Sequence, residues 1–485
     1  ILRLGGNAYD AAIAGGFAAT VAEPLLTSLG GGGFLLARTA DRAETFFDFF
    51  VDTPGRGSAP GSLEPHFFPV TVNFAGSDQD FNIGLGSVAV PGVLKGFLHV
   101  HARLGRLPLA QVVAPAIHLA RRGTPLNRHQ AYVFDLLRPI TSLREDGRAL
   151  FSPGGGCLRE GGLFRNPLLA EFLAELAAGA SEGFYQGPLA ARIASDMEEG
   201  QGLLSQEDLA AYRVIEREPL AVTYRGRRLV TNPPPSFGGS LIAVMLQLLE
   251  KFPLDRARWG SGRHLVTLVG AMAEIDRQRS AVSQNGGFDN LWYDEAASRI
   301  RQFSRGTTHL SVVDTEGNVA AMTTSNGEGS GYLVPGTGIM LNNMMGEDDL
   351  HPEGFHACPP GERVASMMAP SLLAAEDRVE LVLGSGGSKR IRSAIVQVLS
   401  NVADFGLEVT QAVEAPRLHW DGATVQLEPG FPPAAVEELR RHWPVNIWGE
   451  KEIYFGGAHA VIPGRTGAGD PRRGGAAGII EGMVE

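Results

Sequence analysis

The chain has 485 residues, of which 44% are hydrophobic and 20% are charged, a balance that excludes disorder over most of its length. Its net charge is −11 and no dense block of Lys or Arg occurs, which excludes the basic footprint of a nucleic-acid-binding or anionic-lipid-binding protein. A small-molecule ligand is therefore expected.

Two cysteines, Cys157 and Cys358, form neither a disulfide framework nor a zinc-binding set, and no metal or cofactor is expected.

The first residue is Ile1, so a signal peptide is neither seen nor excluded; the cytoplasm is slightly favoured, and the periplasm or secretion stays open. The most apolar window, residues 11–22, ends at Glu23 and is too short to cross a bilayer, which predicts a soluble protein.

The first part of the chain is expected to be mainly helical with a few strands. Ser205 and Asp208 have the spacing of a capping box at a helix start. Helical patterns cover residues 7–22, 94–120 (broken by Pro108 and Pro115), 165–215, 240–251 and 264–283, and strand patterns cover 34–37, after four glycines, and 222–231.

The pattern changes at Thr307. Strands are expected at 308–314 and 319–324, joined by a turn with Gly317 and Asn318 where positive φ is needed. A strand at 379–384, helices at 389–403 and 433–441, and strands near 452–463 follow. The whole is an α/β chain without regular parallel alternation, which predicts a mixed or antiparallel sheet layered between helices.

Several catalytic signatures are absent from the sequence. It contains no His-Glu-x-x-His, no Cys-x-x-Cys, no phosphate-binding Gly-x-x-x-x-Gly-Lys-Ser/Thr and no Gly-x-Ser-x-Gly. Zinc peptidases, P-loop enzymes and serine hydrolases of the α/β type therefore have no support.

Thr307 stands at the entrance of the predicted hairpin, directly after Gly306. A Thr hydroxyl is a weak nucleophile, but an N-terminal Thr carries an α-amine that can serve as its base. This chemistry needs a cut between Gly306 and Thr307, made by the Thr hydroxyl on the Gly306 carbonyl, and a glycine there removes side-chain bulk. On these residues alone, an ordinary strand edge is the more frequent interpretation.

A second candidate is the strand-like segment 382–385, which runs into Gly386 and Gly387 and then into a helix. Consecutive backbone N–H groups at such a position hold anions, including the oxyanion of a tetrahedral intermediate. The alternative is a glycine turn that lets the helix pack closely on the sheet.

The chain resembles the γ-glutamyltransferase family from end to end, through motifs that occur in the order expected of that family. These motifs are Gly5-Gly6-Asn7-Ala8-Tyr9-Asp10-Ala11-Ala12, Glu23-Pro24, Gly30-Gly31-Gly32-Gly33-Phe34, Val90-Pro91-Gly92, Pro234-Pro235-Ser236-Phe237-Gly238-Gly239, Thr307-Thr308-His309-Leu310-Ser311-Val312-Val313-Asp314, Leu341-Asn342-Asn343 and Asp470-Pro471-Arg472-Arg473.

This resemblance implies an N-terminal nucleophile hydrolase fold, a four-layer αββα sandwich, made as a precursor that cleaves itself. The cut would fall between Gly306 and Thr307, giving a large subunit 1–306 and a small subunit 307–485 with Thr307 as nucleophile. The resemblance further assigns the oxyanion hole to Gly386 and Gly387, the hydroxyl that orients the nucleophile to Thr324 or Ser325, and the family Asn to Asn326.

The substrate-binding positions depart from the family pattern. Phe50 stands where the family has a carboxylate-binding Arg, Met344 where it has Gln or Glu, Ser366-Met367 where it has two serines, and Glu347 near the place of an amine-binding Asp. Each lost charge-assisted contact is worth about 1.5–3 kcal/mol, so losing two would weaken binding of a γ-glutamyl group roughly 10²- to 10⁴-fold.

The expected activity is that of an amidohydrolase and acyltransferase, which forms an acyl-enzyme on Thr307 and passes it to water or an amine. The family's own reaction, glutathione hydrolysis, is expected to be weak or absent. Two alternatives stay open. One is an acylase for another acyl group, of the glutaryl-type β-lactam or poly-γ-glutamate-cleaving kind; the other is an uncleaved, non-catalytic ligand-binding homologue. Beyond the two subunits, a higher homo-oligomer is possible in principle, and the sequence does not fix it.

Overall fold

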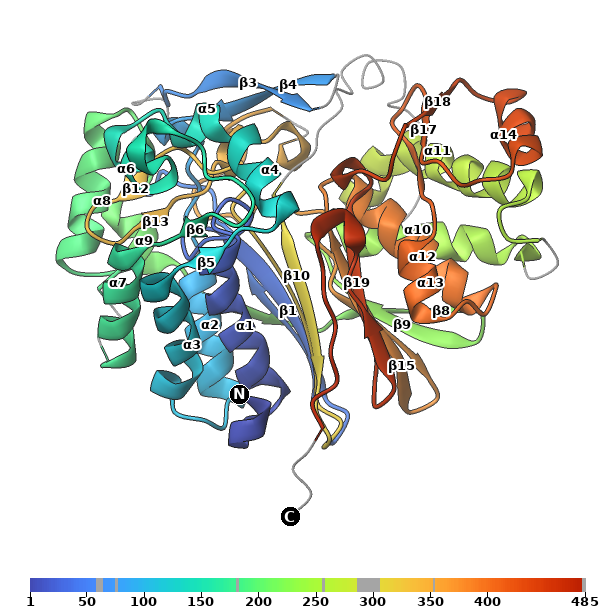
Figure 1. Ribbon diagram of the computed structural model, residues 1–485, viewed down its shortest axis with the longest axis horizontal. Helices are drawn as coiled ribbons and strands as arrows, with labels where there is room; N and C mark the ends of the chain where they lie inside the picture. The colour runs from blue at the N-terminus through green and yellow to red at the C-terminus, as the bar shows by residue number, and fades with distance from the viewer. Residues whose placement is uncertain are drawn as a thin grey trace.

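Two facing β-sheets form the centre of the molecule, and helices cover the outer side of each (Figure 1). The computed structural model describes residues 1–57, 64–74, 77–179, 183–254, 258–285, 306–351 and 354–481. Strand β10 (Thr308–Val313) of the first sheet packs against β15 (Arg378–Gly386) and β19 (Gly457–Ile462) of the second. Helices α1 (Ala8–Ala22) and α2 (Val93–Leu104) cover the first sheet, and α10 (Phe237–Glu250) and α12 (Arg390–Ala403) the second. The predicted four-layer αββα architecture is confirmed.

The first sheet has the strand order β10-β11-β1-β2-β7 and the second has β20-β19-β15-β14-β9-β8. Their remaining strands are β1 (Gly32–Arg38), β2 (Glu44–Phe49), β7 (Ile215–Arg217), β8 (Leu220–Tyr224), β9 (Arg227–Thr231), β11 (Val319–Ser325), β14 (Ser371–Ala375) and β20 (Thr466–Ala468). The smaller sheets contain β3 (Phe68–Phe74), β4 (Ser77–Ile83), β5 (Thr124–Pro125), β6 (Leu163–Phe164), β12 (Leu333–Val334), β13 (Ile339–Met340), β16 (Leu418–Trp420), β17 (Val425–Leu427) and β18 (Val445–Ile447).

The other helices of the described chain lie mostly around the two sheets (Figure 1). They are α3 (Leu109–Arg122), α4 (Arg128–Leu136), α5 (Arg138–Thr141), α6 (Glu145–Phe151), α7 (Pro167–Ala177), α8 (Pro188–Glu199), α9 (Gln206–Ala211), α11 (Gly262–Asn285), α13 (Val409–Glu414) and α14 (Pro433–Arg440). Within the ranges described, none of the helices combines the length and the apolar character needed to cross a bilayer.

Most of the sequence-based elements are present, with local differences. The capping box is confirmed, because the Ser205 side chain accepts from the Asp208 N–H while the Asp208 carboxylate accepts from the Ser205 N–H. The single strand predicted at 222–231 is wrong: it is a hairpin, β8 and β9, turning at Arg225 and Gly226, which both have positive φ. Pro115 was expected to interrupt a helix but lies inside α3.

The predicted hairpin at Thr307 is confirmed as β10 and β11, with Thr308 opposite Thr324 and Val313 opposite Val319. At its turn Gly317 has φ 90°, as expected, whereas Asn318 is not in the left-handed region. The Asp314 carboxylate accepts hydrogen bonds from the N–H groups of Glu316 and Asn318 at 2.9 and 3.0 Å, which makes a second positive φ unnecessary.

The glycine run 30–33 brings β1 very close to β11. A Cβ on Gly31 would stand 2.1 Å from the Ser325 carbonyl oxygen, and one on Gly33 would stand 2.8 Å from that of Thr323. Any larger residue would push the two strands apart. Gly31 and Gly33 therefore fix the backbone around Ser325.

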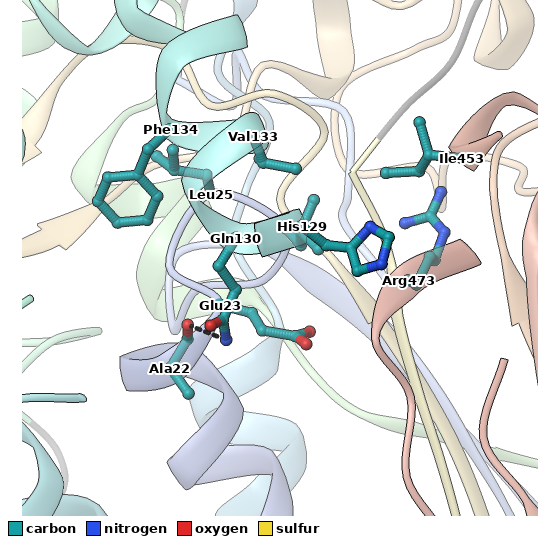
Figure 2. Close-up of a pocket in the computed structure, with 10 residues that line it drawn as sticks. Ala22, Glu23, Leu25, His129, Gln130, Val133, Phe134, Ile453 and Arg473 are labelled. Carbon is teal, nitrogen blue, oxygen red and sulfur yellow. Dashed lines mark hydrogen bonds between the residues drawn. The ribbon is translucent and has the colours of Figure 1, made fainter. Parts of the chain in front are cut away.

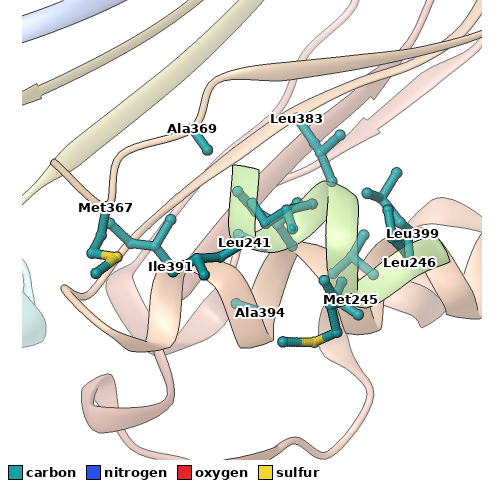
Figure 3. Close-up of a cluster of buried hydrophobic side chains, with 14 of the residues drawn as sticks. Leu241, Met245, Leu246, Met367, Ala369, Leu383, Ile391, Ala394 and Leu399 are labelled. Atoms are coloured by element: carbon teal, nitrogen blue, oxygen red, sulfur yellow. The ribbon is translucent and has the colours of Figure 1, made fainter. Parts of the chain in front are cut away.

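The largest apolar cluster of the described residues contains side chains of both sheets and of the helices that cover the second sheet. Figure 3 shows part of it, with Leu241 and Met245 of α10 facing Ile391 and Leu399 of α12, and Met367 packed at one end. Each of these side chains is almost completely buried. This packing holds α12 on β15, and therefore fixes the glycine pair that connects them.

Both large sheets contain strands from each side of the predicted cut. In the first sheet β11 pairs with β1, from Gly32 opposite Ser325 to Arg38 opposite Val319. In the second sheet β14 pairs with β9. Segments 1–306 and 307–485 therefore share both sheets and meet at one strand pair in each.

Candidate active site

Gly306 and Thr307 lie directly before β10 and are buried, and Thr307 is only 4% exposed. A Cβ on Gly306 would stand 2.5 Å from the Gly327 carbonyl oxygen and 2.9 Å from that of Leu25. Both oxygens belong to the backbone, so they cannot shift without distorting the surrounding structure. Position 306 therefore has no room for a side chain, which agrees with the small residue expected before a self-cleaving Thr.

Ser325 contacts the carbonyl of the predicted scissile bond. Its Oγ donates to the Gly306 carbonyl oxygen at 2.5 Å and accepts from the Gly327 N–H at 3.1 Å. The other candidate hydroxyl, Thr324 Oγ1, instead accepts a 2.8 Å hydrogen bond from Thr27 Oγ1. Of the two alternatives that the sequence left open, Ser325 is the one beside the Gly306–Thr307 bond.

Gly386 is the last residue of β15, Gly387 follows it, and Gly386 lies beside Thr307. A Cβ on Gly386 would stand 2.5 Å from the Thr307 carbonyl oxygen. Gly387 has φ 122°, a conformation that residues with a side chain rarely adopt, and α12 begins at Arg390. The strand, glycine pair and helix are therefore arranged as the sequence predicted, next to Thr307.

His309, the last residue of the Thr-Thr-His motif, is not placed to act as the base for Thr307. Its Nδ1 lies 2.7 Å from Thr323 Oγ1 and its Nε2 lies 2.9 Å from Ser311 Oγ. Complete burial lowers its pKa well below the ordinary value, which keeps the ring neutral. A Cβ on Gly384 would stand 2.3 Å from the ring, so His309 packs β10 against β15.

Two charged side chains lie next to the Thr307–Thr308 backbone. Arg473 Nη1 donates to the Thr307 carbonyl oxygen at 3.2 Å, and Thr308 Oγ1 donates to Glu23 Oε2 at 2.5 Å. Burial lowers the pKa of Arg473 to about 10, opposed by Glu23 and Asp470. Burial also raises the pKa of Glu23, opposed by the Thr308 hydrogen bond and by Arg473.

These two side chains also line a small, partly open cavity of about 20 Å³, room for about one water molecule (Figure 2). Its walls come from the end of α1 and the loop after it, from α4, and from the C-terminal segment. The lining residues are Ala22, Glu23, Leu25, Leu26, His129, Gln130, Val133, Phe134, Ile453 and Arg473. The cavity is thus mainly apolar, with its charged groups on the side of Thr307 and Thr308.

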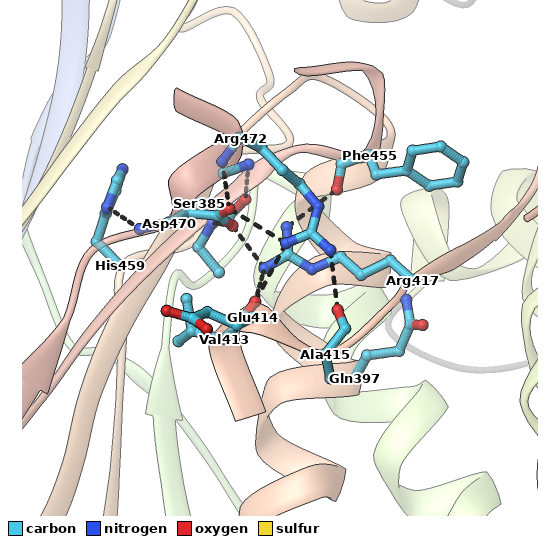
Figure 4. A network of polar contacts seen from close by, with 12 residues as sticks. Ser385, Gln397, Val413, Glu414, Ala415, Arg417, Phe455, His459, Asp470 and Arg472 are labelled. Carbon is cyan, nitrogen blue, oxygen red and sulfur yellow. Dashed lines mark hydrogen bonds and ion pairs between the residues drawn. The ribbon is translucent and has the colours of Figure 1, made fainter. Parts of the chain in front are cut away.

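A buried ionic network holds the segment that carries Arg473 (Figure 4). Asp470 pairs with Arg417 at 2.6 Å and with Arg472 at 3.1 Å, and it accepts from the Ala458 N–H of β19 at 2.8 Å. Arg472 also pairs with Glu428. Because β19 pairs with β15 at Gly457 opposite Gly386, this network fixes the C-terminal segment beside the glycine pair.

The free energy of unfolding is expected to fall steeply below pH 4, because the Asp470 carboxylate becomes protonated there. Although burial acts to raise it, the neighbouring Arg417 and Arg472 lower the pKa of Asp470 from 3.8 to about 2. Between these values the unfolded chain binds more protons than the folded one, so stability rises with pH. The group contributes about 2 kcal/mol above pH 4, which is lost as the pH falls to 2. Urea unfolding at several pH values should show a weaker acid dependence in Asp470→Asn.

Two of the predicted substrate-binding residues, Asn326 and Glu347, lie next to Gly327, whose own carbonyl approaches Gly306. A Cβ on Gly327 would stand 2.1 Å from Asn343 Oδ1 and 2.4 Å from Glu347 Oε1, so Glu347 lies close to the scissile region. The Asn326 N–H donates to the Leu26 carbonyl oxygen at 3.3 Å. Ser366 Oγ accepts from the Met368 N–H at 3.1 Å, and its carbonyl caps the N-terminus of α10.

The apolar replacements lie in the core. Phe50 stacks on Phe34 with ring centroids 5.3 Å apart, and Phe50, Met344 and Met367 all belong to the largest apolar cluster. None of the three lines the cavity beside Thr307. Position 50 therefore provides no polar group to a ligand.

Sequence reasoning missed three residues of the site: Thr27, Glu23 and Arg473. Glu23 and Arg473 stand inside motifs that were recognised, but their place beside Thr307 comes from contacts over 285 and 166 residues of separation. In the described ranges, no three His, Cys, Asp or Glu side chains gather in a way that could hold a metal ion.

The site can be compared with known proteins. The sequence pattern of the family described as Gamma-glutamyltranspeptidase matches residues 1–292 and 273–480. The chain is 33% identical to an Acylase ACY 1 proenzyme of Pseudomonas sp. (strain SE83), over 90% of this chain and 83% of that protein. It is 32% identical to the glutathione hydrolase proenzyme of Escherichia coli (strain K12), over 90% and 82%. Cephalosporin acylase from Bacillus halodurans superposes with a TM-score of 0.83 at 28% identity, covering 99% of this chain and 93% of that one.

Proposed function

Because the chain belongs to the gamma-glutamyltranspeptidase family, we propose that it is an autoprocessed threonine-nucleophile amidohydrolase and acyltransferase with Thr307 as its nucleophile. The observation that carries this assignment is the hydrogen bond from Ser325 Oγ to the Gly306 carbonyl oxygen. This donor lies where negative charge develops when the Gly306–Thr307 bond is attacked, and such donors stabilise the transition state.

Self-cleavage begins with attack of Thr307 Oγ on the Gly306 carbonyl carbon, with loss of the hydroxyl proton. The oxyanion forms at the oxygen that Ser325 contacts, the C–N bond breaks, and the nitrogen takes up a proton. Water then hydrolyses the ester between Gly306 and Thr307. The products are subunits 1–306 and 307–485, with a free α-amine on Thr307.

In the cleaved enzyme the α-amine of Thr307 takes the proton from its own Oγ, because a free α-amine has a pKa of about 8 and is partly neutral near pH 7. Oγ attacks an amide carbonyl of the substrate, and the N–H groups of Gly386 and Gly387 serve as the oxyanion hole. The amine departs with the proton, and water or a second amine releases the acyl group. The close packing of Gly386 on Thr307 supports this assignment.

The proposal is tested by mass spectrometry of the denatured, purified protein. Two fragments are expected, and the second should begin with Thr307. A single intact chain in an active preparation would contradict the proposal, and it would favour instead a ligand-binding homologue that is never cut.

Ser325→Ala is expected to slow self-cleavage about 10²- to 10³-fold, because it removes a hydrogen-bond donor from the developing oxyanion. The rate is measured as the loss of the uncut chain during cell-free synthesis, on denaturing gels. Thr324→Val is the matched control, since its hydroxyl contacts Thr27 rather than the scissile carbonyl. Equal cleavage rates of wild type and Ser325→Ala would remove Ser325 from the mechanism.

Glutathione turnover is expected to be weak, because Phe50 is stacked in the core and offers no cation to an α-carboxylate. Relatives named glutathione hydrolase and acylase leave two acyl classes open, γ-glutamyl and non-γ-glutamyl. We favour the second, and the likeness to a cephalosporin acylase over 99% of the chain supports it. Kinetics on glutathione and on acyl-4-nitroanilides with and without an α-amino group distinguish the two classes. Efficient glutathione hydrolysis would contradict the preference.

The partners of the enzyme follow from the same proposal. The two subunits stay together through their shared sheets, and the substrate is a small amide. The net charge of −11 supports a function that involves no nucleic acid. A cytoplasmic location is part of this proposal, and cell fractionation tests it.

A further inference from the structure

Arg473 makes a direct contact with the residue that becomes an N-terminus in the proposed maturation. Its Nη1 donates to the Thr307 carbonyl oxygen at 3.2 Å, and Thr307 is buried. The carbonyl oxygen and the nitrogen of one residue lie roughly 3 Å apart, so the guanidinium lies within about 6 Å of the nitrogen that the cut turns into an α-amine. That α-amine is the base of the proposed reaction.

The position of the Arg473 guanidinium is fixed by the backbone around it. A Cβ on Gly386 would stand 3.2 Å from Nη1, and one on Gly387 would stand 3.6 Å from Nη2. Along the aliphatic stem, a Cβ on Gly457 would stand 2.1 Å from Cδ. Because the three glycines leave room for this side chain and little more, its charge keeps a fixed place relative to Thr307.

The Arg473 guanidinium stays charged at neutral pH. Burial lowers its pKa to about 10, opposed by Glu23 and Asp470, so the group is almost fully protonated at pH 7. Asp470 is shared between two other guanidinium groups, because it pairs with Arg417 at 2.6 Å and with Arg472 at 3.1 Å. A net positive charge therefore remains beside Thr307.

Two titratable side chains share the wall of the small cavity with Arg473 (Figure 2). Glu23, at the end of α1, accepts from Thr308 Oγ1 at 2.5 Å, and burial raises its pKa, which disfavours the charged form. His129 of α4 faces Arg473 in the same view, and burial lowers its pKa, which favours the neutral ring. Arg473 is therefore the dominant charge on this side of Thr307.

A carboxylate lies on the other side of the scissile bond. Glu347 Oε1 lies 2.4 Å from the point where a Cβ on Gly327 would stand, and the Gly327 carbonyl oxygen in turn approaches Gly306. This carboxylate acts to raise the pKa of an amine at residue 307, whereas Arg473 acts to lower it. Arg473 has the stronger effect, because it contacts residue 307 directly and Glu347 approaches it across two glycines.

The N-terminus of α12 adds further positive charge. Lys389 is the N-cap of this helix, and Arg390 follows it. Arg390 Nε donates to the Tyr454 carbonyl oxygen at 3.0 Å, and its guanidinium lies over the Tyr454 ring. Both cations act on an amine at residue 307 in the same direction as Arg473.

We propose that Arg473 is a positioning residue that acts through the Thr307 α-amine, its fixed charge keeping this amine unprotonated near neutral pH so that it can take the proton of Oγ. This inference rests on the proposed function. A free α-amine has a pKa of about 8, so only about a tenth of it is neutral at pH 7. A buried cation about 6 Å away lowers that pKa to about 7, which leaves about half of the amine able to accept a proton.

The test is the pH dependence of kcat/KM for pentanoyl-4-nitroanilide, a substrate without a group that titrates between about pH 5 and pH 10. In the cleaved wild type the acid limb should have an apparent pKa of about 7, and Arg473→Gln should move it to about 8. The kcat/KM of Arg473→Gln should therefore be about tenfold below that of wild type at pH 6 and within about twofold of it at pH 9. A loss of packing alone would lower kcat/KM equally at every pH.

Arg473→Lys keeps the charge on a shorter side chain, so its limb should lie between those of wild type and Arg473→Gln. If Arg473→Gln stays uncut, Arg473→Lys decides alone, and a limb identical to that of wild type overturns the inference. Arg465→Gln, at an exposed position of the same segment, should leave the limb unchanged.

Self-cleavage provides an internal control, because the nitrogen of Thr307 is an amide in the precursor and does not titrate. The ratio of the cleavage rates of wild type and Arg473→Gln should therefore be the same at pH 6 and pH 9. A ratio that changes with pH as strongly as the amidase ratio does would show that Arg473 does not act through the α-amine.

Trace acetylation of the native, cleaved enzyme with acetic anhydride measures the α-amine without turnover. The acetylation rate at Thr307, read by mass spectrometry of the small-subunit N-terminal peptide, follows the neutral fraction of the amine. Its midpoint should lie about 1 pH unit lower in wild type than in Arg473→Gln. Equal midpoints or parallel kcat/KM profiles in the two cleaved enzymes would overturn the inference and leave the proposed function intact. Absence of a cut before Thr307 in wild type would instead refute the proposed function, and the inference with it, since no α-amine is formed.

Discussion

Thr307→Ala is expected to give a single uncut chain of 485 residues whose amidase activity is at least about 10⁴-fold below that of wild type. In the proposed mechanism the Thr307 hydroxyl performs both reactions: it attacks Gly306 in the precursor and the substrate in the cleaved enzyme. Removing it leaves the Ser325 donor and the glycine pair with nothing to act on. Denaturing mass spectrometry and hydrolysis of acyl-4-nitroanilides measure the two consequences separately.

Thr307→Ser is the matched control, because it keeps both the hydroxyl and, after cleavage, the α-amine. It should still be cut before residue 307 and retain measurable amidase activity. A Thr307→Ala protein that is cut at the same bond, or that hydrolyses the substrates as fast as wild type, would show that another residue is the nucleophile.

Asp470→Asn is expected to destabilise the protein by about 3–5 kcal/mol, because it leaves the buried Arg417 without its carboxylate partner. It should also loosen the segment that holds Arg473 beside Thr307, and so slow self-cleavage. Thermal unfolding is best measured in the Thr307→Ala background, where every molecule is one uncut chain.

Asp377→Asn serves as the control for Asp470→Asn, since its ion pair with Arg42 is formed by side chains that are mostly exposed. Exposed pairs contribute about 0–1 kcal/mol, so its unfolding temperature should stay close to that of the parent. If both variants unfold at the same temperature, the buried network does not stabilise the C-terminal segment.

Local sequence patterns were sufficient for the elements that carry the catalytic backbone. The hairpin at Thr308–Ser325 followed from alternating apolar residues around a glycine turn, and the passage from β15 through Gly386 and Gly387 to α12 followed from its composition. Both depend on interactions between near neighbours in the chain. The layered architecture followed from the order of the elements together with the family motifs.

Contacts between residues far apart in the chain could not be predicted from local sequence patterns. Whether Thr324 or Ser325 faces the scissile carbonyl depends on how β11 pairs with β10, since a shift of one residue exchanges the two faces of a strand. Arg473 reaches Thr307 from a C-terminal segment that the ionic network joins to β19. Sequence spacing contains no measure of these distances, so the charged side of the site appeared only in the structure.

The sharing of both sheets by the two segments also bears on the order of the proposed maturation. Strand β1 lies between β2 and β11, and β9 pairs with β14, so each segment alone would present an unpaired strand edge to solvent. In the proposed maturation, both sheets are therefore expected to be paired before the Gly306–Thr307 bond is broken. After the proposed cut, reassembly from denatured subunits would be a bimolecular reaction between pieces with unpaired strand edges, whereas the uncut precursor folds as a single chain.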